Sequence, residues 1–141
     1  MAQHSITTLW KKNMLFESDN PSGHKLLMDT SVANGGDNEG HGPKALMLSS
    51  LAGCSGLDVV SLLKKMRIEI ADLKIEVTGE LTQEHPKYYH TVTMEYHFYG
   101  GNLVEEKIQK AVDLSVQKYC GVLEMFRKFA TVHTAVHFHT V

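Results

Sequence analysis

Two cysteines, Cys54 and Cys120, are the residues of this chain best suited by type to chemistry. A thiolate is a nucleophile and a redox group, and its formation depends on how the surroundings shift the thiol pKa. Cys54 lies in an apolar stretch, with Ser50 and Asp58 one helical turn to either side, where a cysteine often serves only as a small apolar residue. Cys120 begins a predicted short helix, whose N-terminal N–H groups can lower a thiol pKa. Their spacing alone does not show whether the fold brings the two together.

The nine histidines raise the question of a metal site. His133, His137 and His139 alternate along one face of the predicted last strand, and His97 lies on the polar face of another. Imidazoles arranged in this way can bind zinc. No acidic or cysteine ligand stands at a metal-binding spacing, however, and a solvated histidine face has the same pattern. We therefore expect neither a metal nor another cofactor.

Composition sets the frame for these residues. A chain of 141 residues, 43% hydrophobic and 21% charged, is typical of a globular protein and fits a single domain over residues 1–141. The formal net charge of -2 and the lack of a basic run indicate no nucleic-acid or anionic-membrane partner. The N-terminal residues lack the pattern of a signal peptide, which predicts a reducing cytoplasm and free thiols.

The element that carries Cys54 is a long apolar helix. From 45 to 63 Asp58 is the only charged residue, and the stretch approaches the length of a membrane span. Its serines and glycines, and the soluble-type alternation elsewhere, favour a buried core helix. Pro43 suits the first helical position, and the cations at 64–67 suit the last turn. Asp58 is predicted to be a buried polar group with a hydroxyl partner.

The other elements follow from period and turn residues. We expect strands at 4–10, 14–18, 24–29, 73–81, 91–99 and 131–140, helices at 103–118 and 122–129, and a flexible glycine-rich loop at 34–42. Segregated strands and helices predict an α+β fold with an antiparallel sheet against the central helix. One thin sheet covers only one side of that helix. A second copy of the chain could pack on the other side, which favours a homodimer.

Two motifs resemble those of a known family. The stretch Gly42–Cys54, GPKALMLSSLAGC, is similar to the central-helix motif of the OsmC/Ohr family of thiol peroxidases. The stretch Leu114–Val122, LSVQKYCGV, resembles the second cysteine motif of that family, and the order of elements matches along nearly the whole chain. The similarity is closest to the OsmC-like branch.

This resemblance implies a fold, an assembly and an activity. It implies the OsmC-like fold and an intertwined homodimer in which the central helices are wrapped by the partner's sheet, with the sites at the subunit interface. Cys54 matches the peroxidatic cysteine, whose thiolate attacks a small organic hydroperoxide and becomes a sulfenic acid, and Cys120 matches the resolving cysteine. A thiol or dithiol reductant then restores the pair.

Two positions differ from the peroxidase pattern. The family glutamate ten residues before the reactive cysteine is Lys44 here, and the two arginines, Arg67 and Arg127, lie outside the N-terminal region where the family carries one. Lys44 is therefore a candidate to supply positive charge to the thiolate, or is a solvated residue of the first helical turn. Two functions stay open: a cysteine-based hydroperoxide reductase, and a non-catalytic OsmC-like dimer that binds a small apolar ligand at its interface.

Overall fold

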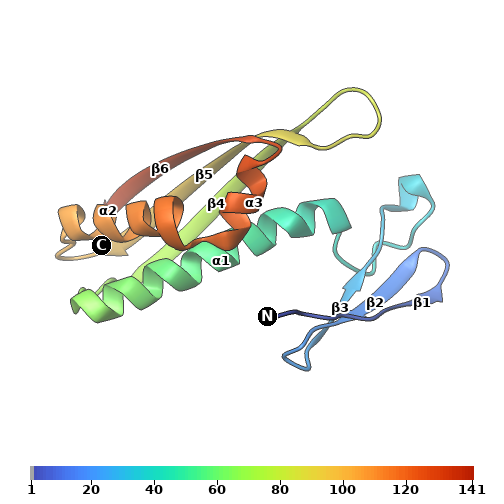
Figure 1. Ribbon diagram of the computed structural model, residues 1–141, viewed down its shortest axis with the longest axis horizontal. Coiled ribbons are helices and arrows are strands. Elements are labelled where there is room, and N and C mark those ends of the chain that lie inside the picture. The colour runs from blue at the N-terminus through green and yellow to red at the C-terminus, as the bar shows by residue number, and fades with distance from the viewer. Residues whose placement is uncertain (1) are drawn as a thin grey trace. The chain divides into compact units, whose positions relative to one another are not determined.

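The computed structural model describes residues 2–141, which form two compact units divided after Met47. The elements are β1 (Thr8–Lys12), β2 (Leu15–Asp19), β3 (Lys25–Met28), η1 (Val32–Asn34), α1 (Pro43–Met66), β4 (Asp72–Leu81), β5 (Tyr89–Gly100), α2 (Glu105–Leu114), η2 (Ser115–Tyr119), α3 (Gly121–Arg127) and β6 (Thr131–Thr140). This order confirms the α+β prediction (Figure 1). The single domain over 1–141 stays a prediction.

The N-terminal unit is built on a three-stranded antiparallel meander in the order β1-β2-β3. Phe16 pairs with Trp10 on one side and with Met28 on the other. The predicted turn at 20–23 joins β2 to β3, and Gly23 has a φ of 89°, which glycine adopts without strain. The three predicted N-terminal strands are thus confirmed, with shifted ends.

The segment predicted as a flexible glycine-rich loop is held by hydrogen bonds. The buried Asp29 carboxylate accepts the backbone N–H groups of Thr30, Asp37 and Glu39 at 2.7, 3.3 and 3.0 Å. These hydrogen bonds hold the pKa of Asp29 below its usual range. Sequence patterning did not reveal this anchor, because one aspartate at the end of a strand carries no special signal.

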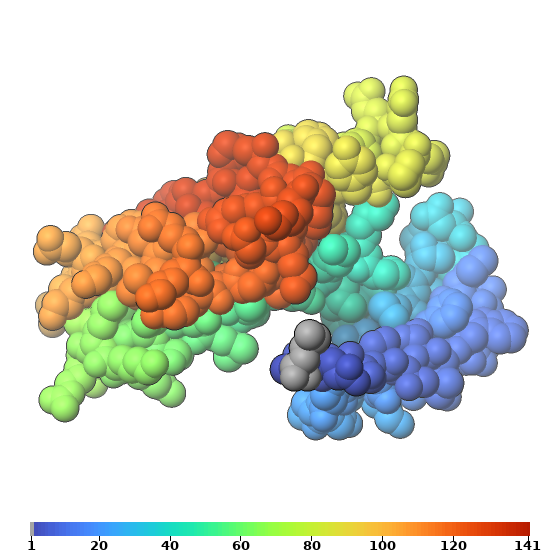
Figure 2. All heavy atoms as spheres, in the orientation of Figure 1, coloured from blue at the N-terminus to red at the C-terminus, as the bar shows by residue number. Residues whose placement is uncertain are grey.

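The C-terminal unit contains a second sheet, in the order β4-β5-β6. The predicted β4–β5 hairpin is antiparallel, and its turn projects beyond the rest of this unit (Figure 2). β6, however, runs parallel to β5, so the sheet is mixed and the prediction of a purely antiparallel sheet was wrong. The reason is the helical crossover through α2, η2 and α3, which returns the chain to the end of the sheet where β5 began.

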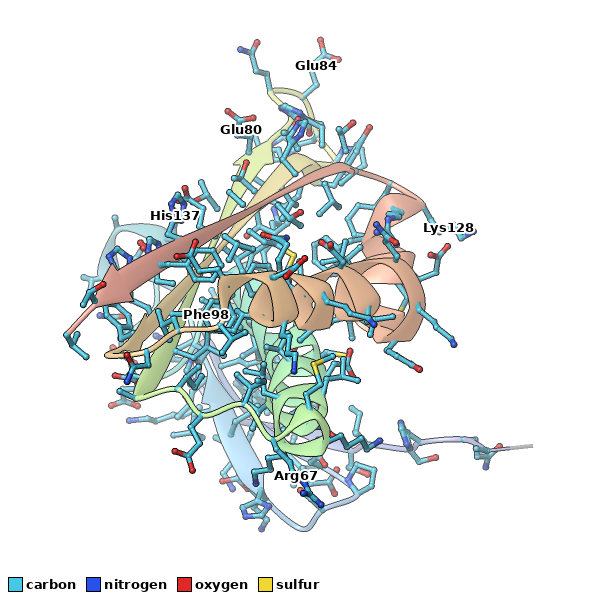
Figure 3. The ribbon with its side chains drawn as sticks, turned by 90° about the vertical axis from the view of Figure 1, so that its left-hand side faces the viewer. Arg67, Glu80, Glu84, Phe98, Lys128 and His137 are labelled. Carbon is cyan, nitrogen blue, oxygen red and sulfur yellow. The ribbon has the colours of Figure 1, made fainter. Side chains whose placement is uncertain are left out.

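One face of this sheet packs against helices and forms the core. Phe98 points from β5 into this layer, whereas His137 lies on the opposite face of the sheet (Figure 3). The core comprises residues from the sheet and from α1, α2 and α3: Leu51, Val59, Leu63, Tyr89, Val92, Met94, Tyr96, Phe98, Ile108, Ala111, Val112, Cys120, Leu123 and Phe126. Alternation in β5 and helical spacing in α2 produce this layer, as the sequence predicts.

The long helix α1 begins at the predicted proline and is followed by Arg67, whose φ is 58°. Its length and composition are enough to cross a membrane, as for the core helix of many soluble proteins. Only four of its residues are buried, at a spacing of four: Leu51, Ser55, Val59 and Leu63. The predicted buried core helix is thus buried along one stripe only in a single chain.

Candidate functional site

Cys54 lies near the middle of α1, next to its buried stripe. The side chain is half-buried and packs against the core of the C-terminal unit, and the following residue, Ser55, is fully buried. The thiol is free. Cys54 therefore has one side in the protein interior and another that a small molecule can approach.

Cys120 lies where α2 ends. The helix continues as one π-helical turn, η2, whose closing hydrogen bond runs from the Cys120 N–H to the Ser115 carbonyl at 2.8 Å. Cys120 then takes an extended conformation and caps α3, its Sγ accepting the Leu123 N–H at 3.4 Å. Only 4% of the residue is exposed. π-Helical turns are rare and are often found at functional sites.

The structure brings the two cysteines together. Cys54 lies close enough to Cys120 to be among the groups that raise the pKa of Cys120, and both residues are free cysteines. Spacing in the sequence did not reveal this proximity. Burial, opposed by the Leu123 N–H and helped by Cys54, raises the pKa of Cys120 to about 11. The expectation that the helix N-terminus would lower this pKa was therefore wrong, since the cost of burying a thiolate outweighs the single N–H bond.

A buried chain of polar groups lies beside the cysteines. The Ser55 hydroxyl is 2.6 Å from the Tyr96 hydroxyl and 2.8 Å from that of Ser115, which in turn donates to an Asp58 carboxylate oxygen at 3.0 Å. Asp58 thus has the hydroxyl partner that the sequence predicts. Roles for Ser55, Tyr96 and Ser115 were not predicted. The sequence held a signal for the two serines only, since each lies on the apolar face of a predicted helix.

Lys44, the third candidate site residue, is exposed in the first turn of α1 and belongs to the N-terminal unit. At about 1.5 Å of rise per residue, ten residues of helix span about 15 Å. Lys44 and Cys54 are therefore too far apart along α1 for the ammonium to contact the thiol. Its role stays a prediction.

An open, mainly apolar groove of about 1030 Å³ runs between α1 and the start of β4. Gly53, Gly56, Leu57 and Val60 line it from the helix. Gly56 lets the helix approach β4 closely, because a Cβ there would lie 3.2 Å from the Ile75 side chain on the opposite wall. Cys54 lies next to Gly53 in the sequence but does not itself line the groove.

The histidines stack on the outer face of the second sheet. The rings of His137 and His139 both stack with the His97 ring, with centroids 4.6 and 5.2 Å away, and His97 Nδ1 is 2.9 Å from His139 Nε2. Glu76 and Glu95 approach His97 and His137 to 3.0 and 3.2 Å. Cross-strand neighbours thus supply carboxylates that sequence spacing did not show. Within residues 2–141, no three histidine, cysteine or acidic side chains are placed to hold a metal ion.

Comparison with known proteins places this geometry in a family. Residues 36–135 match the family described as OsmC-like protein. The chain is 33% identical over 123 residues to protein YhfA of Escherichia coli K12, covering 87% of this chain and 89% of YhfA.

Solved structures agree with this match. A hypothetical protein from Aquifex aeolicus VF5 superposes with a TM-score of 0.87 at 29% identity, covering 100% of this chain and 99% of that one. The organic hydroperoxide resistance protein OhrB of Bacillus subtilis shares the fold, with a TM-score of 0.66 at 20% identity over 96% and 98% of the two chains. The two cysteines, the long helix and the matched residues lead to one conclusion: this chain belongs to the OsmC-like protein family.

Proposed function

We propose that this protein reduces small organic hydroperoxides through Cys54 and Cys120. The observation that carries the proposal is the proximity of two free cysteines, since Cys54 helps to raise the pKa of Cys120, which ends a π-helical turn. Family relatives that include organic hydroperoxide resistance proteins support it. The half-buried position of Cys54 beside an apolar core suits an organic hydroperoxide better than hydrogen peroxide.

The reaction proceeds in three balanced steps. The Cys54 thiol loses its proton, and the thiolate attacks the hydroperoxide, forming an S–O bond and breaking the O–O bond; the departing alkoxide takes up that proton and leaves as the alcohol. The Cys120 sulfur then attacks the Cys54 sulfenic acid, so that an S–S bond forms and the S–O bond breaks. A dithiol reductant finally returns two electrons and two protons to the disulfide.

The raised pKa of Cys120 fits the second of these steps. With a pKa of about 11, Cys120 is a neutral thiol at physiological pH. The proton that the thiol loses on attack is the one that the departing hydroxide needs to leave as water. Cys120 is therefore suited to resolving the sulfenic acid and not to attacking the hydroperoxide.

Mass spectrometry of the reduced protein after addition of equimolar cumene hydroperoxide tests this proposal. We expect both thiols to disappear, the mass to fall by two hydrogens, and a Cys54–Cys120 disulfide to appear among the peptides. Dithiothreitol is expected to restore the thiols and sustain turnover. Thiols that stay reduced while the hydroperoxide stays intact would contradict the proposal.

Lys44 is proposed as a source of positive charge for the Cys54 thiolate. Since positive charge at the start of α1 favours a thiolate, Lys44→Ala is expected to slow the alkylation of Cys54 by iodoacetamide at pH 7, by about twofold at a separation of about 15 Å along the helix. Lys65→Ala, an exposed lysine at the other end of α1, is the matched control. Equal alkylation rates in the two variants and the wild type would exclude a role for Lys44.

We also propose that the chain is a homodimer in a reducing cytoplasm, where free thiols persist. On α1, Met47, Leu57 and Val60 are 45, 76 and 40% exposed, although the helix is strongly apolar. On the N-terminal sheet Trp10 is 66% exposed. Exposed apolar surfaces of this extent mark interaction sites, and a second copy is the partner that the family resemblance implies.

The groove beside α1 favours a second candidate function. A volume of about 1030 Å³ with apolar walls suits a small apolar ligand, whether or not the cysteines react. This alternative is a non-catalytic dimer that holds such a ligand at its interface. It would be supported if the wild type and Cys54→Ser consumed hydroperoxide equally slowly and bound an apolar fluorescent probe equally well.

A further inference from the structure

The buried polar chain beside the cysteines has a single direction. A carboxylate at Asp58 only accepts hydrogen bonds, so the Ser115 hydroxyl donates to it. The Ser55 hydroxyl then donates to Ser115, and the Tyr96 phenol donates to Ser55. Burial raises the pKa of Tyr96 to about 12, which keeps its donor proton in place. Ser55 and Ser115 therefore each donate one hydrogen bond and accept another, in a chain that begins at the Tyr96 phenol and ends on a carboxylate.

This chain connects the two segments that carry the cysteines. Ser55 and Asp58 lie on α1, one and four residues after Cys54. Ser115 is the first residue of η2, and its carbonyl accepts the Cys120 N–H at 2.8 Å. Ser115 thus bonds α1 through its hydroxyl and the Cys120 backbone through its carbonyl. A shift of η2 along α1 would break both hydroxyl bonds at buried positions, where an unpaired polar group is costly.

Tyr96 connects this polar chain to the sheet. Its ring is fully buried on β5, and the phenol reaches Ser55 from the sheet. α1 is therefore held both to η2 and to the sheet at the turn that carries Cys54. Apolar contacts alone allow small displacements of a helix, whereas hydroxyl bonds of 2.6 to 3.0 Å tolerate little change in length.

We propose that Tyr96, Ser55, Ser115 and Asp58 are positioning residues that hold the Cys120 thiol against Cys54 and so raise the effective concentration of one thiol toward the other. This inference rests on the proposed function, in which the pair forms a disulfide. It assigns these four residues to the resolving step and not to the attack on hydroperoxide.

The test measures disulfide formation without any hydroperoxide. The wild type and the variants Ser115→Ala and Asp58→Ala are equilibrated in buffers of reduced and oxidised glutathione, and the fraction of Cys54–Cys120 disulfide gives the effective concentration of the pair. We expect a fall of about 10-fold or more in both variants, since each removes a bond that fixes η2 on α1.

Two controls separate positioning from stability. Ser61→Ala removes an exposed hydroxyl of α1 and is expected to change nothing. Val59→Ala leaves a cavity beside the same buried stripe, lowers stability and keeps the polar chain, so its effective concentration is expected to stay within about twofold of the wild type.

Three results would overturn the proposal: Ser115→Ala and Asp58→Ala equal to the wild type, Val59→Ala falling as far as they do, or a wild-type pair that never forms a disulfide. A wild type that forms the disulfide readily in glutathione but consumes no hydroperoxide would refute the proposed function while leaving the positioning role supported.

Discussion

Cys54→Ser is expected to lose hydroperoxide reduction by roughly 1000-fold or more, because removing the nucleophile of a covalent mechanism removes every later step as well. Cys120→Ser is expected to behave differently. Its Cys54 thiolate still attacks the hydroperoxide once, with a rate close to that of the wild type, and the product then persists as a sulfenic acid. The two variants therefore separate the attack from the resolution.

The measurement is a pair of assays on each protein. Steady-state consumption of cumene hydroperoxide with dithiothreitol reports turnover, and dimedone labelling followed by mass spectrometry reports sulfenic acid. Because the chain has only two cysteines, each single variant carries one thiol and any label has one location. We expect strong labelling of Cys120→Ser and none of Cys54→Ser.

Reversed roles would be informative. If Cys120→Ser lost the single attack and Cys54→Ser kept it, the assignment of attacking and resolving cysteine would be wrong. The burial of Cys120 and its raised pKa argue against this outcome, since a neutral and enclosed thiol is a poor nucleophile toward a hydroperoxide. Ser61→Ala removes an exposed hydroxyl of α1, keeps both cysteines and serves as the reference that is expected to behave as the wild type.

The sequence predicted the elements of this fold well because each carries a strong periodic pattern. The alternation of β5 and the turn signals around it locate the β4–β5 hairpin closely. The direction of β6 relative to β5 could not be predicted from alternation, because alternation is the same in parallel and antiparallel strands. That direction depends on the path of the crossover helices, a property of the whole unit.

For the site, residue types identified the cysteines but not their environment. The chain position of Cys120 at a helix start predicts a lowered pKa, and only the packing shows that burial reverses the shift. Tyr96 reads as one more apolar position of an alternating strand, and Ser115 as one member of a helical face. Their bonds to Ser55 join residues far apart in the sequence, which no local pattern reports.

Leu57→Glu is expected to dissociate the proposed homodimer. In a single chain Leu57 is 76% exposed, so a charged residue there would change stability by only about 0.5 kcal/mol. Covered by a second copy, the same carboxylate would be buried without a partner in an apolar groove, at a cost of roughly 3 kcal/mol or more. The large difference between these two values makes the variant a sensitive test of what covers α1.

Sedimentation velocity and thermal unfolding measure the outcome. We expect the wild type to sediment as a dimer and Leu57→Glu to sediment as a single chain with a clearly lower Tm. Met125→Glu is the matched control, because Met125 is also an apolar helix residue, 64% exposed, but lies on α3 outside the groove. A Leu57→Glu protein that keeps the wild-type mass and Tm would show that this face of α1 is open to solvent, and the groove would then be free for a small apolar ligand.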